Sequence, residues 1–171
     1  MGNATDRRNV TTSTDPSRSG IDGVLATLPP AYLVAGQAEA RFVVGPTGAF
    51  LLLPTGREHT EVAVAADQLA ALVNKTRNAL CDHLTWVPFL DALLVTSADP
   101  PRGADVTVAP LDLVHDVLTE GPTVITLGTI NAIRDVVRTA RLDGWRVGNG
   151  EGASIDVRDP AEPTARVTPT R

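Results

Sequence analysis

Cysteine, aromatic residues and long apolar runs are all scarce in this chain of 171 residues. Cys81 is the single cysteine, so no disulfide can form within the chain, and a reducing compartment is the simplest setting. Three Phe, two Trp and one Tyr are too few for a surface that stacks on nucleic-acid bases. No apolar run is long enough to span a bilayer, and no segment near the start has the pattern of a secretory signal. We therefore expect a cytoplasmic protein that does not bind membranes.

An excess of basic residues is also absent. The formal net charge is −5, from 15 Lys and Arg against 20 Asp and Glu. Residues 20–148 carry this whole charge, because the +1 of residues 1–19 and the −1 of residues 149–171 cancel. Proteins that bind nucleic acids take most of their affinity from Lys and Arg that neutralise phosphates. The acidic central segment therefore argues against nucleic acid as a partner.

Composition divides the chain into three parts. Hydrophobic residues make up 43% and charged residues 20%, which is ordinary for a globular protein, and the length suffices for one core. Residues 1–19 and 149–171 are rich in polar residues, Gly and Pro and lack apolar periodicity. We predict one α/β domain over residues 20–148, with a disordered tail on each side.

Two short apolar runs joined by a glycine-rich turn form the centre of this domain. Residues 42–44 and 49–53 are rich in β-branched and aromatic side chains and have the length of strands. Gly45-Pro46-Thr47-Gly48 between them is typical of a turn, in which proline fixes φ and glycine permits a positive φ. The second run shows no polar alternation, as expected for a strand that is covered on both faces. The sequence therefore predicts a β-hairpin in the core.

Apolar periodicity places the other elements around this hairpin. A helix over 61–84, followed by a strand over 90–96, predicts a right-handed crossover and a parallel pairing with the hairpin's second strand. Thr129 is the expected N-cap of the last helix, and Gly144 its C′ residue. The remaining expected elements are strands at 32–34, 106–108 and 123–127 and helices at 21–28, 111–119 and 130–142.

The hairpin resembles the nuclease-related domain (NERD) family, a branch of the Mg-dependent nucleases with the restriction-endonuclease-like fold. The likeness rests on the ungapped run Val43-Val44-Gly45-Pro46-Thr47-Gly48 and on Phe50. It implies a mixed sheet built from hairpin, crossover helix and parallel strand, flanked by helices, over roughly residues 24–145. It also implies a metal site made of an aspartate, a glutamate and a lysine on the strands, with a glutamine early in the following helix.

The residues at these family positions cannot hold magnesium. The aspartate position falls on Ala40, the glutamate position on Leu53 and the lysine position on Thr55. Mg²⁺ takes hard oxygen ligands, and neither Ala nor Leu supplies one. Gln68 is a candidate remnant of the family glutamine, although a solvated helix residue explains it equally well. We therefore predict no catalytic residue, no metal and no cofactor.

Three glutamates near these positions leave a displaced metal site as an alternative. Glu39 precedes Ala40, and the one-residue offset is expected to point its side chain to the other face of the strand. Glu58 and Glu61 follow the hairpin and could turn back towards it. Arg41 would add repulsion against a cation.

Other residues capable of chemistry have no suitable neighbours in the sequence. Cys81 and His83 are two apart on a predicted helix, so we interpret Cys81 as a small buried side chain and His83 as a surface residue. His59 and His115 have no visible partners. We interpret both tryptophans, Trp86 and Trp145, as core edges or interface anchors.

The last predicted helix carries a basic strip. Arg134, Arg138 and Arg141 are spaced to share one face, which is either an ordinary solvated face or a docking strip for an acidic partner. The leading hypothesis is a nuclease-fold domain without catalysis that binds another protein or serves in assembly, self-association included. The alternatives are a Mg-dependent nuclease with displaced ligands and a non-catalytic nucleic-acid binder, which the acidic charge disfavours.

Overall fold

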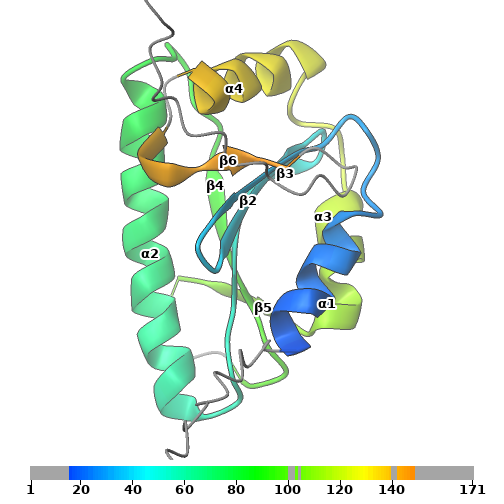
Figure 1. Ribbon diagram of the computed structural model, residues 1–171, viewed down its shortest axis with the longest axis vertical. Helices are drawn as coiled ribbons and strands as arrows, with labels where there is room; N and C mark the ends of the chain where they lie inside the picture. Colours follow the sequence, from blue (N-terminus) through cyan, green and yellow to red (C-terminus); the bar gives the residue numbers. More distant parts are fainter. Residues whose placement is uncertain (1–15, 100–102, 104, 140–141, 149–171) are drawn as a thin grey trace, which may run out of the picture.

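A six-stranded mixed β-sheet forms the middle of the molecule. The computed structural model describes residues 16–99, 103, 105–139 and 142–148, and Figure 1 shows their arrangement. The strands lie side by side in the order β5-β4-β3-β2-β1-β6. Their bounds are β1 (Leu33–Gln37), β2 (Ala40–Gly45), β3 (Gly48–Pro54), β4 (Leu90–Val95), β5 (Thr107–Ala109) and β6 (Arg146–Val147).

Strand pairing confirms the predicted hairpin and crossover. β6, β1, β2 and β3 are antiparallel to one another in that order, and Val43 of β2 lies opposite Phe50 of β3. β3, β4 and β5 are parallel, with Leu51 opposite Ala92. The helix α2 (His59–Cys81) connects β3 to β4, as its apolar periodicity predicted. The chain therefore has the expected α/β class with a mixed sheet.

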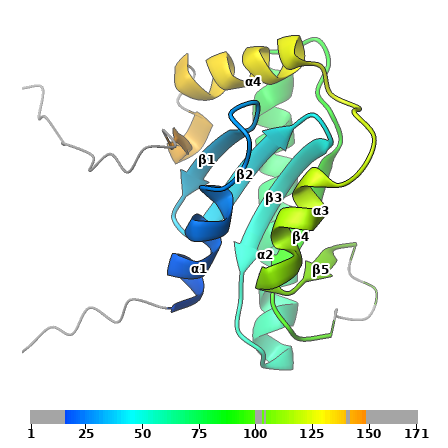
Figure 2. The ribbon, with the colours of Figure 1, turned by 90° about the vertical axis from the view of Figure 1, so that its right-hand side faces the viewer.

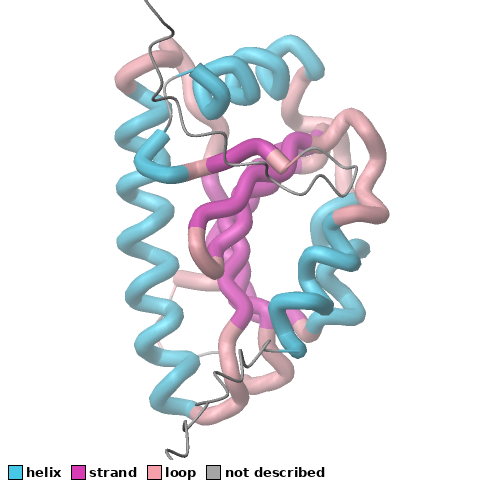
Figure 3. Tube along the Cα trace, in the orientation of Figure 1, coloured by secondary structure: helices cyan, strands magenta, loops and turns pink. Residues whose placement is uncertain are grey.

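Helices cover both faces of the sheet. α2 and α4 (Leu127–Thr139) pack on one face, and α1 (Pro16–Leu25) and α3 (Val114–Thr119) pack on the other (Figures 1 and 2). Figure 3 shows the strands as the layer between them. Two 3₁₀ helices, η1 (Leu111–Leu113) and η2 (Leu142–Gly144), complete the described elements. None of the helices described has both the length and the apolar character that a membrane crossing demands.

The central strand β3 is buried from both sides, which explains its unbroken apolar sequence. Ala49 and Leu51 belong to the core beneath α2 and α4. Phe50 and Leu52 belong to the core beneath α1 and α3. Side chains alternate between faces along a strand, so a strand with two covered faces needs an apolar residue at every position.

The two glycines of the hairpin turn serve close packing, which corrects the prediction that they supply a positive φ. Neither is among the glycines with positive φ in the described residues, which are Gly103, Gly121 and Gly144. A Cβ at Gly45 would come within 1.9 Å of the Tyr32 ring, and a Cβ at Gly48 within 2.8 Å of the Phe50 ring. Only a residue without a side chain leaves room for these rings.

The hairpin turn also holds later parts of the chain by hydrogen bonds. The Pro46 carbonyl accepts from the backbone N–H groups of Val124 (2.8 Å) and Ile125 (3.0 Å). The Tyr32 hydroxyl donates to the carbonyl of Leu118 at 3.1 Å, and the Thr47 hydroxyl donates to the same oxygen. These contacts explain why the predicted strand at 123–127 is wrong: this segment lies against the turn instead of pairing in the sheet.

Several element ends differ from the sequence expectation. α1 begins at Pro16, within the expected tail 1–19, because proline suits the first position of a helix. α4 begins at Leu127, and Thr126, not Thr129, caps it: the Thr129 N–H donates to the Thr126 hydroxyl at 3.3 Å. Gly144, at φ +90°, ends η2 instead of α4. The rest of the predicted tails and Arg141 lie outside the described residues.

Replacing Gly45 with Ala should lower the free energy of unfolding by about 2–3 kcal/mol, because the added methyl group displaces the Tyr32 ring. Gly23→Ala is the matched control: a Cβ there meets nothing within 4 Å, and alanine within α1 should stabilise by up to about 1 kcal/mol. Urea denaturation of both variants measures the difference. In a Tyr32→Ala background most of the cost of Gly45→Ala should disappear, and a cost that persists undiminished would contradict the packing explanation.

Candidate functional site

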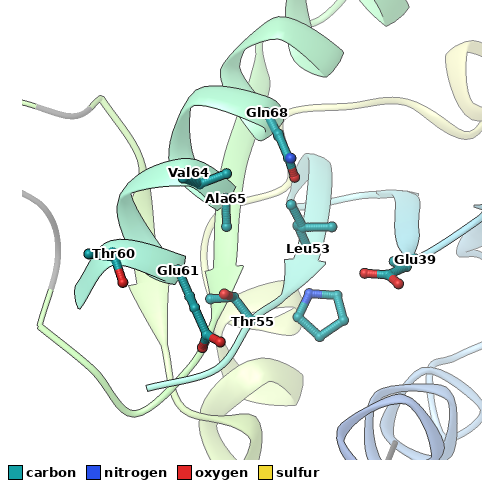
Figure 4. Close-up of a pocket in the computed structure, with 9 residues that line it drawn as sticks. Glu39, Leu53, Thr55, Thr60, Glu61, Val64, Ala65 and Gln68 are labelled. Carbon is teal, nitrogen blue, oxygen red and sulfur yellow. The ribbon is translucent and has the colours of Figure 1, made fainter. Parts of the chain in front are cut away.

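A cavity lies where the family resemblance places the catalytic residues, at the end of β3 beside the first turns of α2 (Figure 4). Its volume is about 370 Å³. Such a volume is within the range of small-ligand sites. It is lined by Glu39, Leu53, Pro54, Thr55, Thr60, Glu61, Val64, Ala65 and Gln68.

Three of the four predicted family positions meet at this cavity. Leu53 and Thr55 come from the end of β3, and Gln68 comes from α2, with its side chain directed towards Leu53 in Figure 4. Ala40 is buried and belongs with Leu53 to the core beneath α2. The hairpin register pairs Arg41 with Leu52, so Ala40 and Leu53 are next to each other at the end of that ladder. The surface is therefore apolar where the resemblance implies metal ligands.

Glu39 and Glu61 line the same cavity from different directions. Figure 4 shows them on opposite sides of Leu53. The expectation that Glu39 points to the other face is wrong, because Glu39 lies in the turn before β2, where strand alternation does not apply. The preceding Ala38 has φ 47°, a left-handed backbone that redirects the chain at this turn. Within the described ranges, no group of three His, Cys, Asp or Glu side chains could hold a metal.

The two glutamates that follow the hairpin, Glu58 and Glu61, belong to the start of α2. Glu58 is the N-cap residue, with no side-chain capping hydrogen bond, and does not line the cavity. Glu61 lies in the first turn, where a negative charge is stabilised by the helix dipole. Its carboxylate rests on Gly56, since a Cβ at Gly56 would come within 1.9 Å of Glu61 Oε2. Glu61 is thus held at the edge of the cavity by the helix that begins there.

Arg41, which was expected to repel a cation, is not among the residues that line the cavity and is paired with a carboxylate. Its guanidinium binds Asp22 of α1 through Nε to Oδ1 (2.8 Å) and Nη2 to Oδ2 (3.0 Å). The same group donates to the carbonyls of Ala38 and Ala40. This two-point ion pair joins α1 to β2.

The remaining candidate residues are not brought together. Cys81 is exposed, so the prediction of a buried side chain is wrong: it is the last residue of α2, beyond the buried stripe. His83 is exposed as well, and His115 Nδ1 lies 3.5 Å from Oδ1 of its neighbour Asp116. Trp145 is buried against Phe42, with ring centroids 5.8 Å apart, whereas Trp86 is 58% exposed.

A pair of aspartates that sequence reasoning missed lies at the other end of α2. Asp91 and Asp105 line a cavity of about 320 Å³ together with Asn74 and Arg77. Burial and the nearby Asp105 carboxylate raise the pKa of Asp91. The signal was present in the sequence, because Asp91 is the only charged residue of the strand L-D-A-L-L-V.

The raised pKa of Asp91 gives a pH-dependent stability with a defined sign. A folded-state pKa above the unfolded value of about 3.9 means that ionised Asp91 destabilises the fold, and that this cost vanishes once pH falls below about 3.9. Asp91→Asn should therefore raise the melting temperature at pH 7 and give no gain at pH 3. The gain in the free energy of unfolding at pH 7 should be less than about 1 kcal/mol, because solvent screens the site. Thermal melts across this range, with Asp67→Asn on the exposed side of α2 as control, measure it. A gain that is equal at both pH values would contradict this account.

No family model, no curated protein sequence and no solved structure matches this chain. The function must therefore be inferred from the residues and geometry of the molecule itself.

Proposed function

We propose that this chain is a module of the nuclease-related-domain type, with a restriction-endonuclease-like arrangement, in which the metal site is lost and the scaffold binds another protein. The observation that carries this proposal is the position of Leu53. It stands with Thr55 and Gln68 at one cavity, where the resemblance implies a glutamate, a lysine and a glutamine. The hairpin, the crossover helix α2 and the parallel strand β4 provide the scaffold that the resemblance implies.

The chemistry of this cavity supports the loss of catalysis. A metal-dependent nuclease needs carboxylates that hold the ion, activate water and neutralise the leaving oxygen. Ala40 and Leu53 instead extend the apolar core up to the cavity. Apolar side chains of fitting volume at a former polar site stabilise a fold, so such replacements are retained once catalysis is no longer required.

Exposed apolar side chains support a role in binding another protein. Val64 lines the cavity and is 56% exposed. Trp86 and Phe89, in the segment between α2 and β4, are 58% and 69% exposed. Large apolar and aromatic side chains of this kind form the anchors of protein interfaces.

One observation favours a second candidate function, a nuclease with displaced ligands. Glu39 and Glu61 both line the cavity, so a cation that drew them together would have two carboxylates and the oxygen atoms of Thr55 and Gln68 nearby. The opposite placement of the two glutamates around Leu53 weighs against this candidate, because metal ligands must converge on one point.

Cleavage assays separate the two candidates. The wild-type protein should not cleave plasmid DNA or RNA with Mg²⁺ or Mn²⁺, because two anionic ligands are missing. The triple variant Ala40→Asp/Leu53→Glu/Thr55→Lys restores the family residues and should gain saturable Mn²⁺ binding in calorimetry and a melting temperature that rises with Mn²⁺. Cleavage by the wild-type protein that disappears in Glu39→Gln/Glu61→Gln would overturn the proposal in favour of displaced ligands.

The binding role can be tested without a known partner. An exposed apolar surface without its partner promotes self-association, so sedimentation velocity of the wild-type chain should show association that increases with concentration. Trp86→Ser/Phe89→Ser should weaken that association, while the distant charge change Arg57→Glu should leave it unchanged. A wild-type chain that stays monomeric at every concentration would contradict the use of these side chains as an interface.

A further inference from the structure

A small cavity lies between the second half of α2, the end of β1 and η2, and it shares no residue with the cavity at the end of β3. In Figure 1 the short helix that precedes β6 lies beside α2, and the small cavity is at this contact. Its volume is about 10 Å³. A polar cavity needs roughly 10–15 Å³ to hold one water molecule, so there is room here for one and no more. The lining residues are Gln37, Lys75, Thr76, Ala79, Leu142 and Trp145.

Thr76 of α2 brings a buried hydroxyl group to this cavity. The residue is 2% exposed, and its Oγ1 makes no hydrogen bond with any residue that the structure describes. A threonine hydroxyl within a helix commonly donates to the carbonyl four residues earlier, as Thr119 does to His115 at 2.8 Å. Thr76 does not make this bond. Buried polar groups in folded proteins are nearly always paired, with protein or with an ordered water molecule, so this hydroxyl indicates a bound partner.

Gln37, the last residue of β1, supplies a second polar group to the cavity. Its Oε1 is fully buried, and its Nε2 lies against η2, where a Cβ at Gly144 would come within 3.3 Å of it. Gly144 has φ +90°, a conformation that favours glycine, so the amide group can pack closely on this turn. A side-chain carbonyl oxygen has two lone pairs and can accept a hydrogen bond from water beside its other contacts.

Apolar side chains make up most of the remaining lining. Leu142 and Trp145 are each 5% exposed and belong to the core beneath α2, and Ala79 packs against the same core. These side chains offer no hydrogen bond to the Thr76 hydroxyl. A water molecule held among them has the two polar partners that a buried water needs, at Thr76 and at Gln37.

We infer that this cavity is a binding site for one structural water molecule, held between Thr76 Oγ1 and Gln37 Oε1. The water accepts a hydrogen bond from the Thr76 hydroxyl and donates one to the Gln37 oxygen. It thereby links α2 to the end of β1 beneath η2, and such a bridge stabilises nearly as well as a direct hydrogen bond. This inference is independent of the family resemblance and of the proposed function.

Thr76→Val tests the inference by the sign of its effect, because valine keeps the shape of threonine and removes only the hydroxyl. With water bound, the melting temperature of the full-length chain should fall by about 2–5 °C, the shift for one lost hydrogen bond in a domain of this size. Thr60→Val, at an exposed threonine of the same helix, is the control and should leave the melting temperature nearly unchanged. An unchanged or higher melting temperature in Thr76→Val would overturn the inference, because removal of an unpaired buried hydroxyl does not destabilise.

A high-resolution crystal structure of the wild-type chain tests the site directly and does not depend on the stability of a variant. One ordered water molecule should lie about 2.5–3.0 Å from both Thr76 Oγ1 and Gln37 Oε1. The same water should persist in Thr76→Ser, which keeps the hydroxyl. Well-defined density for both side chains in the wild-type chain, with no water density between them, would overturn the inference.

Discussion

The close approach of the Tyr32 ring to Gly45 is the contact on which much of the structure depends. It brings the segment before β1 against the tip of the central hairpin. The Tyr32 hydroxyl then reaches the end of α3 at the Leu118 carbonyl, and the Pro46 carbonyl receives the segment that leads into α4. One turn of four residues therefore contacts elements from both ends of the domain, through ring packing at Gly45 and hydrogen bonds of Pro46 and Thr47.

The position of the hairpin also determines which residues surround the candidate cavity. The hairpin fixes β3 in the middle of the sheet, and the crossover through α2 brings Gln68 and Glu61 over the end of that strand. A scaffold of this kind could position metal ligands at Ala40 and Leu53, and the chain has apolar side chains there instead. Arg41 and Asp22 form a two-point ion pair across α1 and β2, and neither residue lines the cavity. The polar groups that remain around Leu53 are held by the turn before β2 and by the start of α2.

The parts of the fold that the sequence predicted are those with a strong repeating pattern. The hairpin, the long amphipathic α2 and the buried β4 each show a period or an unbroken apolar run, and all three are confirmed. Features decided by contacts distant in sequence were missed. Residues 123–127 have strand-like composition, but the N–H groups of Val124 and Ile125 donate to the Pro46 carbonyl instead of to a neighbouring strand. The direction of Glu39 depends on the turn before β2. The cap of α4 depends on which of two threonines, three residues apart, binds the helix N–H groups. A groove that contains Arg134 and Arg138 forms only where α1, β1 and α4 meet. A single sequence does not encode these in a local pattern.

The proposed function requires that the cavity at the end of β3 holds no metal ion. Nuclear magnetic resonance of the ¹⁵N-labelled full-length chain during addition of Mn²⁺ tests this most directly, because a bound paramagnetic ion broadens the amide signals around it. The account predicts no selective broadening of the amides of Glu39, Leu53 and Glu61 as Mn²⁺ is raised. Saturable broadening centred on these residues would contradict it and would place a metal ion between the two glutamates.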